Sequence, residues 1–243
     1  MVTKERLVVT TSWDDGHELD AKLGLELANH GFTGTFYIAP QCAGISTLKR
    51  ITPAALRDLA GQFEIGSHTY THPRLTRLTR AESAQEIEFG KVALEDILGR
   101  AVTSFCYPYG AYRGEHVALV RAAGFSVART VRRFCTGVSN DPLQLATTSH
   151  AVRHRADLWR VVSRSHTSSE ALAGWAHWDV LARQLFDEAM AAGGIYHLWG
   201  HSWEIEANGD WPRLRSLLRY IADQDGVRFA TNAELGARPG SAG

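Results

Sequence analysis

The sequence predicts an α/β protein in which helices cover a parallel β-sheet. Short apolar runs bounded by Gly, Pro, Ser or Asp alternate along the chain with longer segments of helical periodicity. Such alternation produces either a closed (β/α) barrel or a doubly wound open sheet, and in both the carboxyl ends of the strands form the functional face. The 243 residues are enough for one such domain.

The expected elements follow from these runs. The strands are predicted at residues 6–13, 33–38, 63–67, 103–107, 125–130, 158–163, 195–201 and 227–230. The helices are predicted at residues 18–30, 53–60, 80–98, 114–123, 169–192 and 211–224.

Two local signals and two irregular segments complete this assignment. The helix over 80–98 begins with a capping box, because Thr79 and Glu82 have the required spacing. Residues 132–157 have no clear period and are rich in turn formers, so we expect a long loop over the functional face. The domain is expected to span residues 1–236, followed by a disordered tail at 237–243.

Composition excludes several classes of protein. The 26 Lys and Arg residues balance 26 Asp and Glu residues, which argues against nucleic-acid binding. Cys42, Cys106 and Cys135 are odd in number and widely spaced, so neither a disulfide framework nor a structural zinc knuckle is expected. No apolar run has signal-peptide length at the N-terminus or approaches the ~20 residues that cross a bilayer. We therefore expect a cytoplasmic protein without a membrane span.

The first polar cluster is the stretch TTSWDDGHELD, which directly follows the apolar run of the first predicted strand. Its adjacent carboxylates, Asp14 and Asp15, repel each other. Keeping both charged near a core costs several kcal/mol unless a partner or a metal compensates them. The pair therefore indicates a compensating group.

The second cluster contains His68 and His72 in the stretch GSHTYTHP, after the strand at 63–67. Pro73 disfavours a helical conformation at His72, so a loop is expected here. Two imidazoles and one carboxylate, for which Asp15 is the natural candidate, form the open three-ligand site of Zn²⁺ or a similar ion. The alternative is that the histidines only satisfy a polar loop.

Two further clusters also lie at predicted strand ends. The stretch SFCYPYGAY covers residues 104–112, and alone it indicates no more than an aromatic turn. The stretch IYHLWGHSWEIE covers residues 195–206 and brings His197 or His201, together with Glu204, to the same face.

Taken together, the four clusters resemble the motif series of the polysaccharide deacetylases, the NodB-like carbohydrate esterase family 4. The matching motifs, in order, are Asp14-Asp15-Gly16, His68-x-x-x-His72, Pro108-Tyr109-Gly110 and a leucine-containing strand ending in a histidine. The resemblance covers roughly residues 7–230. It implies a distorted (β/α) barrel of seven to eight parallel strands in a single domain, and metal-dependent removal of acyl groups from amino sugars.

By position, the resemblance also implies roles for individual residues. Asp14 would be the general base, and Asp15, His68 and His72 would hold the metal. The metal is expected to be Zn, with Co or Ni as alternatives.

The remaining implied roles are those of acid and oxyanion donor. The general acid would be His201, with His197 as the alternative, and would protonate the leaving amine. The backbone N–H of Tyr109 would help to bind the oxyanion.

The sequence departs from the family pattern in two places. Cys106 stands where the family commonly has an arginine that orients the base, and the family's fourth motif, with an aspartate and a tryptophan, is not located. Arg129, at the end of the neighbouring predicted strand, is the candidate to supply the guanidinium.

Three functions remain open at this stage. The first is metal-dependent N-deacetylation of a small or oligomeric amino sugar. The second is hydrolysis of another non-peptide C–N bond, in a cyclic amide or ureide. The third is an inactive carbohydrate-binding module, which the complete set of candidate catalytic residues disfavours. The sugar, the acyl group and the oligomeric state stay open.

Overall fold

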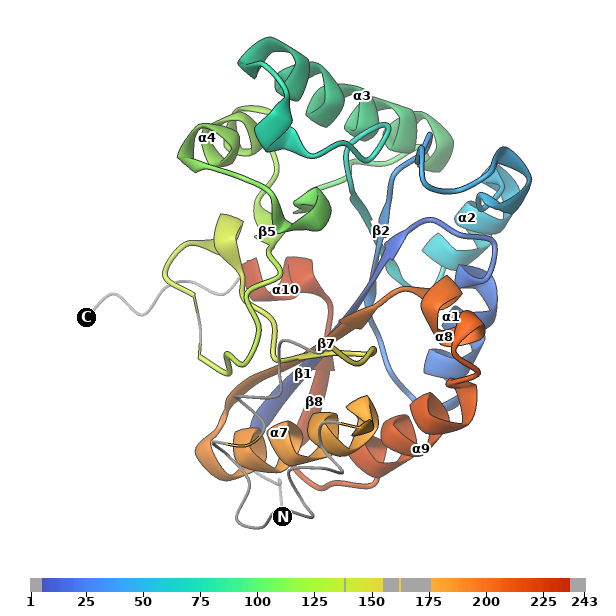
Figure 1. Ribbon diagram of the computed structural model, residues 1–243, viewed down its shortest axis with the longest axis vertical. Coiled ribbons are helices and arrows are strands. Elements are labelled where there is room, and N and C mark those ends of the chain that lie inside the picture. Colours follow the sequence, from blue (N-terminus) through green and yellow to red (C-terminus); the bar gives the residue numbers. More distant parts are fainter. Residues whose placement is uncertain (1–5, 138, 155–161, 163–175, 237–243) are drawn as a thin grey trace.

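The computed structural model describes residues 6–137, 139–154, 162 and 176–236. Within them the chain forms a curled eight-stranded sheet in which every strand pair is parallel (Figure 1). The strands are β1 (Leu7–Asp15), β2 (Thr35–Ile38), β3 (Glu64–Ser67), β4 (Ser104–Cys106), β5 (Val127–Arg129), β6 (Ser149–His150), β7 (Gly194–Gly200) and β8 (Val227–Ala230).

Helices connect the strands and lie mainly outside the sheet. The α-helices are α1 (Asp20–Asn29), α2 (Pro53–Ala60), α3 (Arg80–Leu98), α4 (Gly114–Ala122), α7 (Trp178–Ala192), α8 (Ser202–Ala207), α9 (Trp211–Ala222) and α10 (Asn232–Gly236). Short 3-10 turns are η1 (Thr47–Lys49), η2 (Leu75–Arg77), η3 (Pro108–Gly110) and η4 (Pro142–Gln144).

Strand β1 lies in the middle of the sheet, and all nine of its residues are buried. Its first part pairs with β7 on one side and β8 on the other, whereas its last part pairs with β7 and β2. Asp14 and Asp15 lie opposite Tyr37 and Ile38 of β2, so both aspartates are still inside the strand rather than beyond its end.

The curled sheet forms the distorted (β/α) barrel that the sequence predicts. The strand order is β5-β4-β3-β2-β1-β7-β6. Leu145 forms a parallel bridge with Arg129 of β5, and β6 follows a few residues later to pair with β7. The segment 145–150 therefore joins the two ends of the curled sheet, although residues 132–157 had been expected as a loop. Residues 138 and 155–157 of that loop lie outside the described residues.

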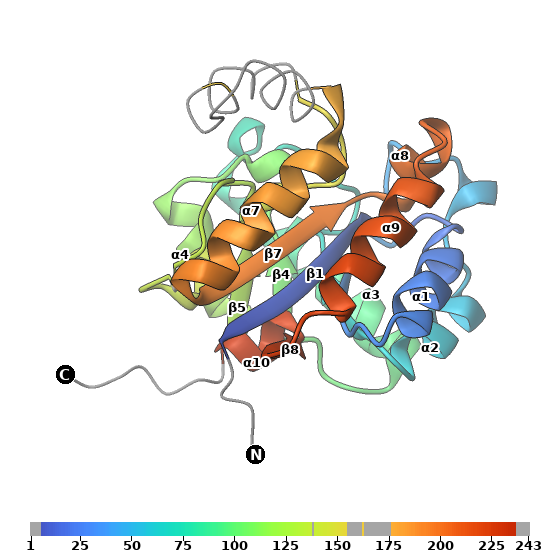
Figure 2. The same ribbon diagram turned by 90° about the horizontal axis from the view of Figure 1, so that it is seen from below.

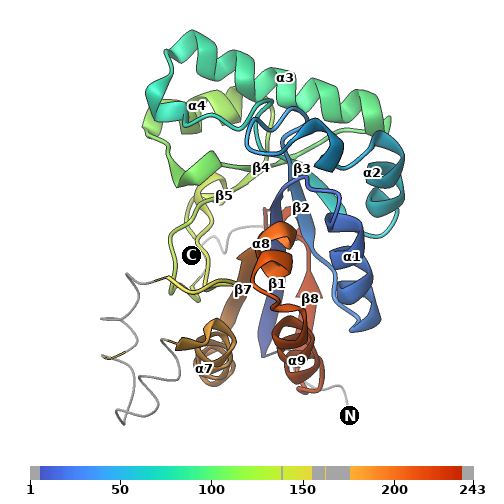
Figure 3. The same cartoon turned by 45° about the vertical axis from the view of Figure 1, so that its right-hand side comes forward.

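Most helices pack with an apolar face against the outside of the sheet. Figures 2 and 3 show α7 and α9 beside β7, β1 and β8, with α1 and α2 further around the same surface. The capping box at Thr79 and Glu82 is present, and Gly99 ends α3 in the left-handed conformation with φ 66°. No helix within the described part of the chain is both long and apolar enough to cross a membrane.

Other predictions differ from the structure in informative ways. Helices α8 and α10 were not predicted, because five or six residues are too few to show a helical period. The strand expected at 158–163, except for residue 162, the first part of the helix expected at 169–192, and the tail at 237–243 all lie outside the described residues.

Successive side chains of β1 point to opposite faces of the sheet, and one of these faces carries polar side chains. Leu7, Val9 and Trp13 belong to the large core, whereas Val8 belongs to a small separate cluster with Ile195 and Ala230. Since successive side chains of a strand point to opposite faces, Asp14 shares the second face. Thr10 and Ser12, also on that face, both contact His197. The interior therefore becomes polar towards the end of β1 that carries the aspartates.

Candidate metal centre and active site

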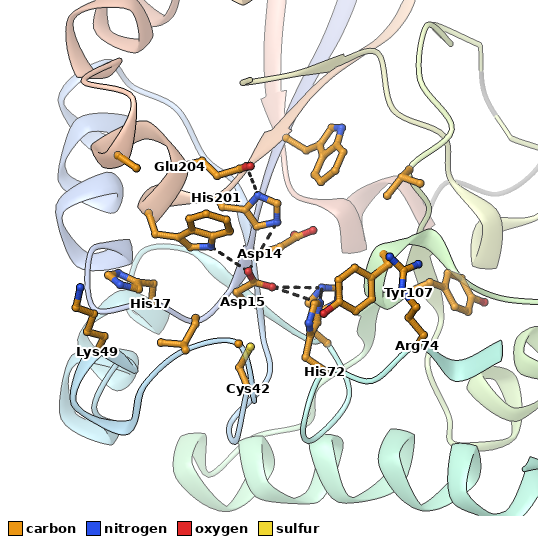
Figure 4. A pocket seen from close by; sticks show the side chains of 18 of the residues that line it. Asp14, Asp15, His17, Cys42, Lys49, His72, Arg74, Tyr107, His201 and Glu204 are labelled. Carbon is orange, nitrogen blue, oxygen red and sulfur yellow. Dashed lines mark hydrogen bonds and ion pairs between the residues drawn. The ribbon is translucent and has the colours of Figure 1, made fainter. Parts of the chain in front are cut away.

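A cavity of about 970 Å³ opens at the carboxyl ends of the strands (Figure 4). It brings together predicted residues from four strand ends that are far apart in the sequence. Those that line it are Asp14, Asp15, His68, His72, Tyr109 and His201. Arg129 and His197, the other two candidates, do not line it.

Asp15, His68 and His72 converge on one point at the floor of this cavity. Oδ1 of Asp15 lies 3.4 Å from Nε2 of His72 and 3.9 Å from Nε2 of His68. The two Nε2 atoms lie 3.1 Å apart. One ligand atom from each residue can therefore contact a single ion.

The protonation of the two histidines suits a metal. Burial lowers the pKa of His68 to about 3, and it also lowers the pKa of His72, so both rings are neutral at pH 7. In a neutral ring, a 2.7 Å contact between Nδ1 of His68 and the Cys106 carbonyl requires the proton on Nδ1. Nε2 of His68 then presents a lone pair to the site, as metal ligation requires.

Asp15 carries an oxygen that no described group satisfies. Its Oδ2 accepts a hydrogen bond of 3.0 Å from the indole N–H of Trp203. Its Oδ1 is buried and has no hydrogen-bond partner among the described residues. An unpartnered carboxylate oxygen beside two imidazole nitrogens is an arrangement of acceptors that a divalent cation fits.

The backbone around these residues is strained. Asp15, His72 and Tyr109 have φ values of 88°, 65° and 57°, in a region that non-glycine residues rarely occupy. Strain of this kind persists only where the surrounding structure enforces it, and it is concentrated at functional sites.

Helix α3 supports the loop that carries the two histidines. The backbone N–H groups of Tyr70 and Thr71 donate to Oε2 of Glu86, at 3.1 and 2.8 Å. One turn further along, a Cβ atom at Gly90 would lie 2.5 Å from the backbone of Thr69. Neither Glu86 nor Gly90 was expected from the sequence, because both act on a loop that belongs to another element.

Asp14 is placed and charged differently from Asp15. Burial raises its pKa to about 7; the charge of His201 lowers this pKa and that of Asp15 raises it. Its Oδ2 accepts a long contact of 3.5 Å from the Cys106 thiol, while Oδ1 is buried without a partner among the described residues. Asp14 is therefore a carboxylate that can gain and lose a proton near neutral pH.

Arg129 does not hold Asp14 in the way that the sequence suggested. Its guanidinium donates to the carbonyl of Ala146 and to Oδ1 of Asn232, at the start of α10. No hydrogen bond or ion pair joins it to Asp14 in the described part of the chain, and Cys106 makes the side-chain contact instead. Its positive charge still lowers the pKa of Asp14, but less than the charge of His201 does.

His201 faces the candidate metal ligands from the opposite wall. Its Nε2 lies 3.8 Å from Oδ2 of Asp15, and its Nδ1 forms a short hydrogen bond with Oε2 of Glu204. Burial alone would lower the pKa of His201, but the hydrogen bond to Glu204 and the charge of Asp15 outweigh it and raise the pKa to about 9. His201 is therefore a proton donor at neutral pH.

His150, which sequence analysis did not single out, lies behind this pair. Its Nε2 is 3.5 Å from Oε2 of Glu204, and its ring stacks on Trp199 at 3.7 Å. Burial alone would raise the pKa of Glu204, but the nearby rings of His150 and His201 hold it well below its usual range. Glu204 thus stays negatively charged beside His201.

His197, the alternative acid, lies away from the cavity. It is buried inside the barrel, with Nδ1 2.7 Å from the Thr10 hydroxyl and Nε2 3.1 Å from the Ser12 hydroxyl. Burial lowers its pKa well below the usual value. This neutral, enclosed ring is a structural histidine.

The comparisons with known proteins agree with this fold. The family model described as polysaccharide deacetylase matches residues 2–128, just over half of the chain. The chain therefore belongs to the polysaccharide deacetylase family. No protein of curated function matches the sequence.

Solved structures of low sequence identity share the fold. A candidate polysaccharide deacetylase from Mycobacterium smegmatis aligns with TM-score 0.71 and 17% identity over 97% of this chain and 91% of that chain. A family 4 carbohydrate esterase from Streptomyces lividans aligns with TM-score 0.57 and 18% identity, over 92% and 91%. The Streptococcus pyogenes deacetylase PplD aligns with TM-score 0.53 and 16% identity. The match covers 56% of this chain and 62% of that chain, so this chain spans less than two thirds of the length of PplD.

Proposed function

We propose that the protein is a metal-dependent hydrolase that removes an N-acyl group, most simply N-acetyl, from an amino sugar. The observation that carries this proposal is the convergence of Asp15, His68 and His72 on one point, with Asp14 and His201 beside it. Family membership supports a deacetylase, and the arrangement of these side chains supports the metal dependence.

The three converging residues would hold one divalent ion, for which Zn²⁺ is the first candidate and Co²⁺ or Ni²⁺ the alternatives. When bound, such an ion lowers the pKa of water and polarises an acyl carbonyl. Oδ1 of Asp15 would be the oxygen that holds it, because Oδ2 already accepts a hydrogen bond from Trp203.

Asp14 and His201 divide the proton transfers between them. Asp14, with an unpartnered Oδ1 and a pKa of about 7, accepts the proton of the attacking water. His201 keeps a proton on Nε2, because its Nδ1 is bonded to Glu204, and donates that proton to the leaving amine. Without this donation an amide nitrogen is too basic to leave.

The walls of the cavity support a carbohydrate substrate. Trp199, Trp203 and Tyr109 line it, and half of the Tyr109 side chain is exposed. Flat aromatic faces at an open cavity can cover the apolar face of a sugar ring. The backbone N–H of Tyr109, in the strained turn η3, is proposed to bind the developing oxyanion.

A substrate and metal screen tests the proposal. Purified protein is loaded with Zn²⁺, Co²⁺ or Ni²⁺ and assayed with N-acetylated amino sugars and with cyclic amides and ureides. We expect release of acetate from amino sugars only. Activity on the cyclic compounds alone would show that the second class of hydrolase is correct.

Four variants test the assigned roles. His68→Ala and His72→Ala should lose most bound metal, measured after dialysis. Asp14→Asn and His201→Ala should keep the metal and lose activity by about 10²-fold or more. Full metal retention by both histidine variants would place the metal elsewhere.

A further inference from the structure

Arg74 lies directly beside the candidate metal ligands. Its guanidinium carbon lies 4.2 Å from the ring centre of Tyr109, and that ring lies 4.4 Å from the ring of His72. This stack holds a positive charge at the wall of the cavity (Figure 4). None of the described carboxylates forms an ion pair with Arg74.

A second cation lies on the opposite side of the same cavity. Lys49, at the end of η1, lines the cavity near His17, away from Arg74 in Figure 4. Its segment is fixed to the loop after β1 by two backbone hydrogen bonds. The N–H of Glu18 donates to the Lys49 carbonyl, and the N–H of Ile51 donates to the Gly16 carbonyl. Within the described part of the chain, the Lys49 ammonium also has no ion-pair partner.

Each of the three carboxylates that line the cavity already has a partner or a proposed role. Glu204 is bonded to His201, Asp15 faces the two histidines, and Asp14 has the role of base. Within the described part of the chain, none of these three carboxylates forms an ion pair with Arg74 or Lys49. The charges of Arg74 and Lys49 at the cavity wall can therefore attract an anion from solution.

From this arrangement we infer that the substrate is an N-acyl amino sugar that also carries an acidic group, a carboxylate or a phosphate, which Arg74 binds. A guanidinium presents a fixed fork of donors that matches either group. Lys49 adds attraction from the other wall. This inference rests on the proposed function and names the class of substrate for the same site.

Matched substrates test the inference. The zinc-loaded enzyme is assayed at low ionic strength with N-acetylglucosamine, with its C6 carboxylate counterpart and with its 6-phosphate. We expect kcat/KM to be at least about tenfold higher for an acidic substrate, the effect of one charge-assisted hydrogen bond. The carboxylate and phosphate arms show which group is preferred. Equal kcat/KM for all three substrates would overturn the inference.

Arg74→Met should lower about tenfold the ratio of kcat/KM for the acidic substrate to kcat/KM for the neutral substrate. Arg74→Lys should restore part of this ratio. The control is Arg77→Met, because Arg77 is exposed three residues away and does not line the cavity. The ratio should be unchanged in the control, and bound zinc should be equal in all variants. If Arg74→Met has the same ratio of acidic to neutral kcat/KM as the wild type, Arg74 is excluded as the anion contact.

An equilibrium measurement separates this inference from the proposed function. If the wild-type enzyme turns over none of the three sugars, the proposed function fails, and their binding to zinc-loaded Asp14→Asn protein is measured by calorimetry. Binding of an acidic sugar about tenfold tighter than the neutral one would support anion recognition. Equal dissociation constants would overturn it.

Discussion

The indole N–H of Trp203 donates a 3.0 Å hydrogen bond to Oδ2 of Asp15. Trp203 belongs to α8, directly after β7, whereas Asp15 ends β1. The bond fixes the carboxylate so that Oδ1 faces His68 and His72. A side chain of α8 therefore orients a candidate metal ligand of β1.

The first prediction concerns this bond. Trp203→Phe keeps an aromatic ring but removes the donor, so the Asp15 carboxylate can rotate. We expect the dissociation constant for Zn²⁺ to rise by about 10-fold or more, the usual effect of losing a hydrogen bond to a metal ligand. Competition with a fluorescent chelator measures it. Trp199→Phe is the control, since Trp199 lines the cavity but stacks on His150. Equal zinc affinity in the two variants would exclude this role for Trp203.

The second prediction concerns the support of the histidine loop. Glu86→Ala removes the acceptor for the backbone N–H groups of Tyr70 and Thr71, so two part-buried donors lose their partner. The loop should lose its strained conformation, and zinc affinity should fall by about 10-fold. Glu88→Ala on the exposed side of α3 is the matched control. If calorimetry finds the same zinc affinity in both variants, the loop holds its conformation without Glu86.

The third prediction is a change in pH dependence. Glu204→Gln removes the negative charge that bonds to Nδ1 of His201, so the pKa of His201 should fall below about 9. The acid then loses its proton at lower pH, and the alkaline limb of the kcat profile moves downward. A bound ion would offset the charge of Asp15, so the expectation rests on Glu204.

Glu206→Gln is the control for this change, because Glu206 lies on the same helix but bonds to Trp211 and Lys22. Its pH profile should match that of the wild type. An alkaline limb that stays in place in Glu204→Gln would contradict the assignment of His201 as the acid.

The fourth prediction separates two effects of Arg129. Arg129→Met leaves the Ala146 carbonyl and the Asn232 side chain without a buried donor, which should cost about 2–4 kcal/mol of stability. Removing the charge also raises the pKa of Asp14, so the acidic limb of the pH profile should move upward. Urea unfolding measures the first effect and steady-state kinetics the second. An unchanged acidic limb would leave Arg129 with a structural role only.

Much of the fold could be predicted because local patterns agree with it. The bounds of α2 and α3 match the predicted ranges, since Pro53 at the first helical position and the capping box at Thr79 are local signals. Strand β6 could not be predicted, because its polar residues form a strand only through pairing with β7, which follows more than forty residues later.

The site could be predicted in part for the same reason. Parallel strands bring their carboxyl ends to one edge, so the proximity of Asp15, His68 and His72 followed from their places at the end of β1 and just after β3. The contacts of Trp203 and Glu86 depend on side-chain directions across separate elements, which no local pattern records. Strands β4 and β5 are neighbours as expected, but Arg129 turns to Asn232 in the short helix α10.

The position of β1 in the sheet affects how the protein is made. Leu7 pairs with Gly194 and Val227, so the first half of β1 has no neighbours in the sheet until residues far along the chain have been made. Until then, an apolar strand that carries two aspartates has open edges, which favour aggregation. Contacts between such distant residues also slow folding. Because the cavity takes His201 from beyond β7 as well as Asp15 from β1, it cannot be complete before β7 has been made.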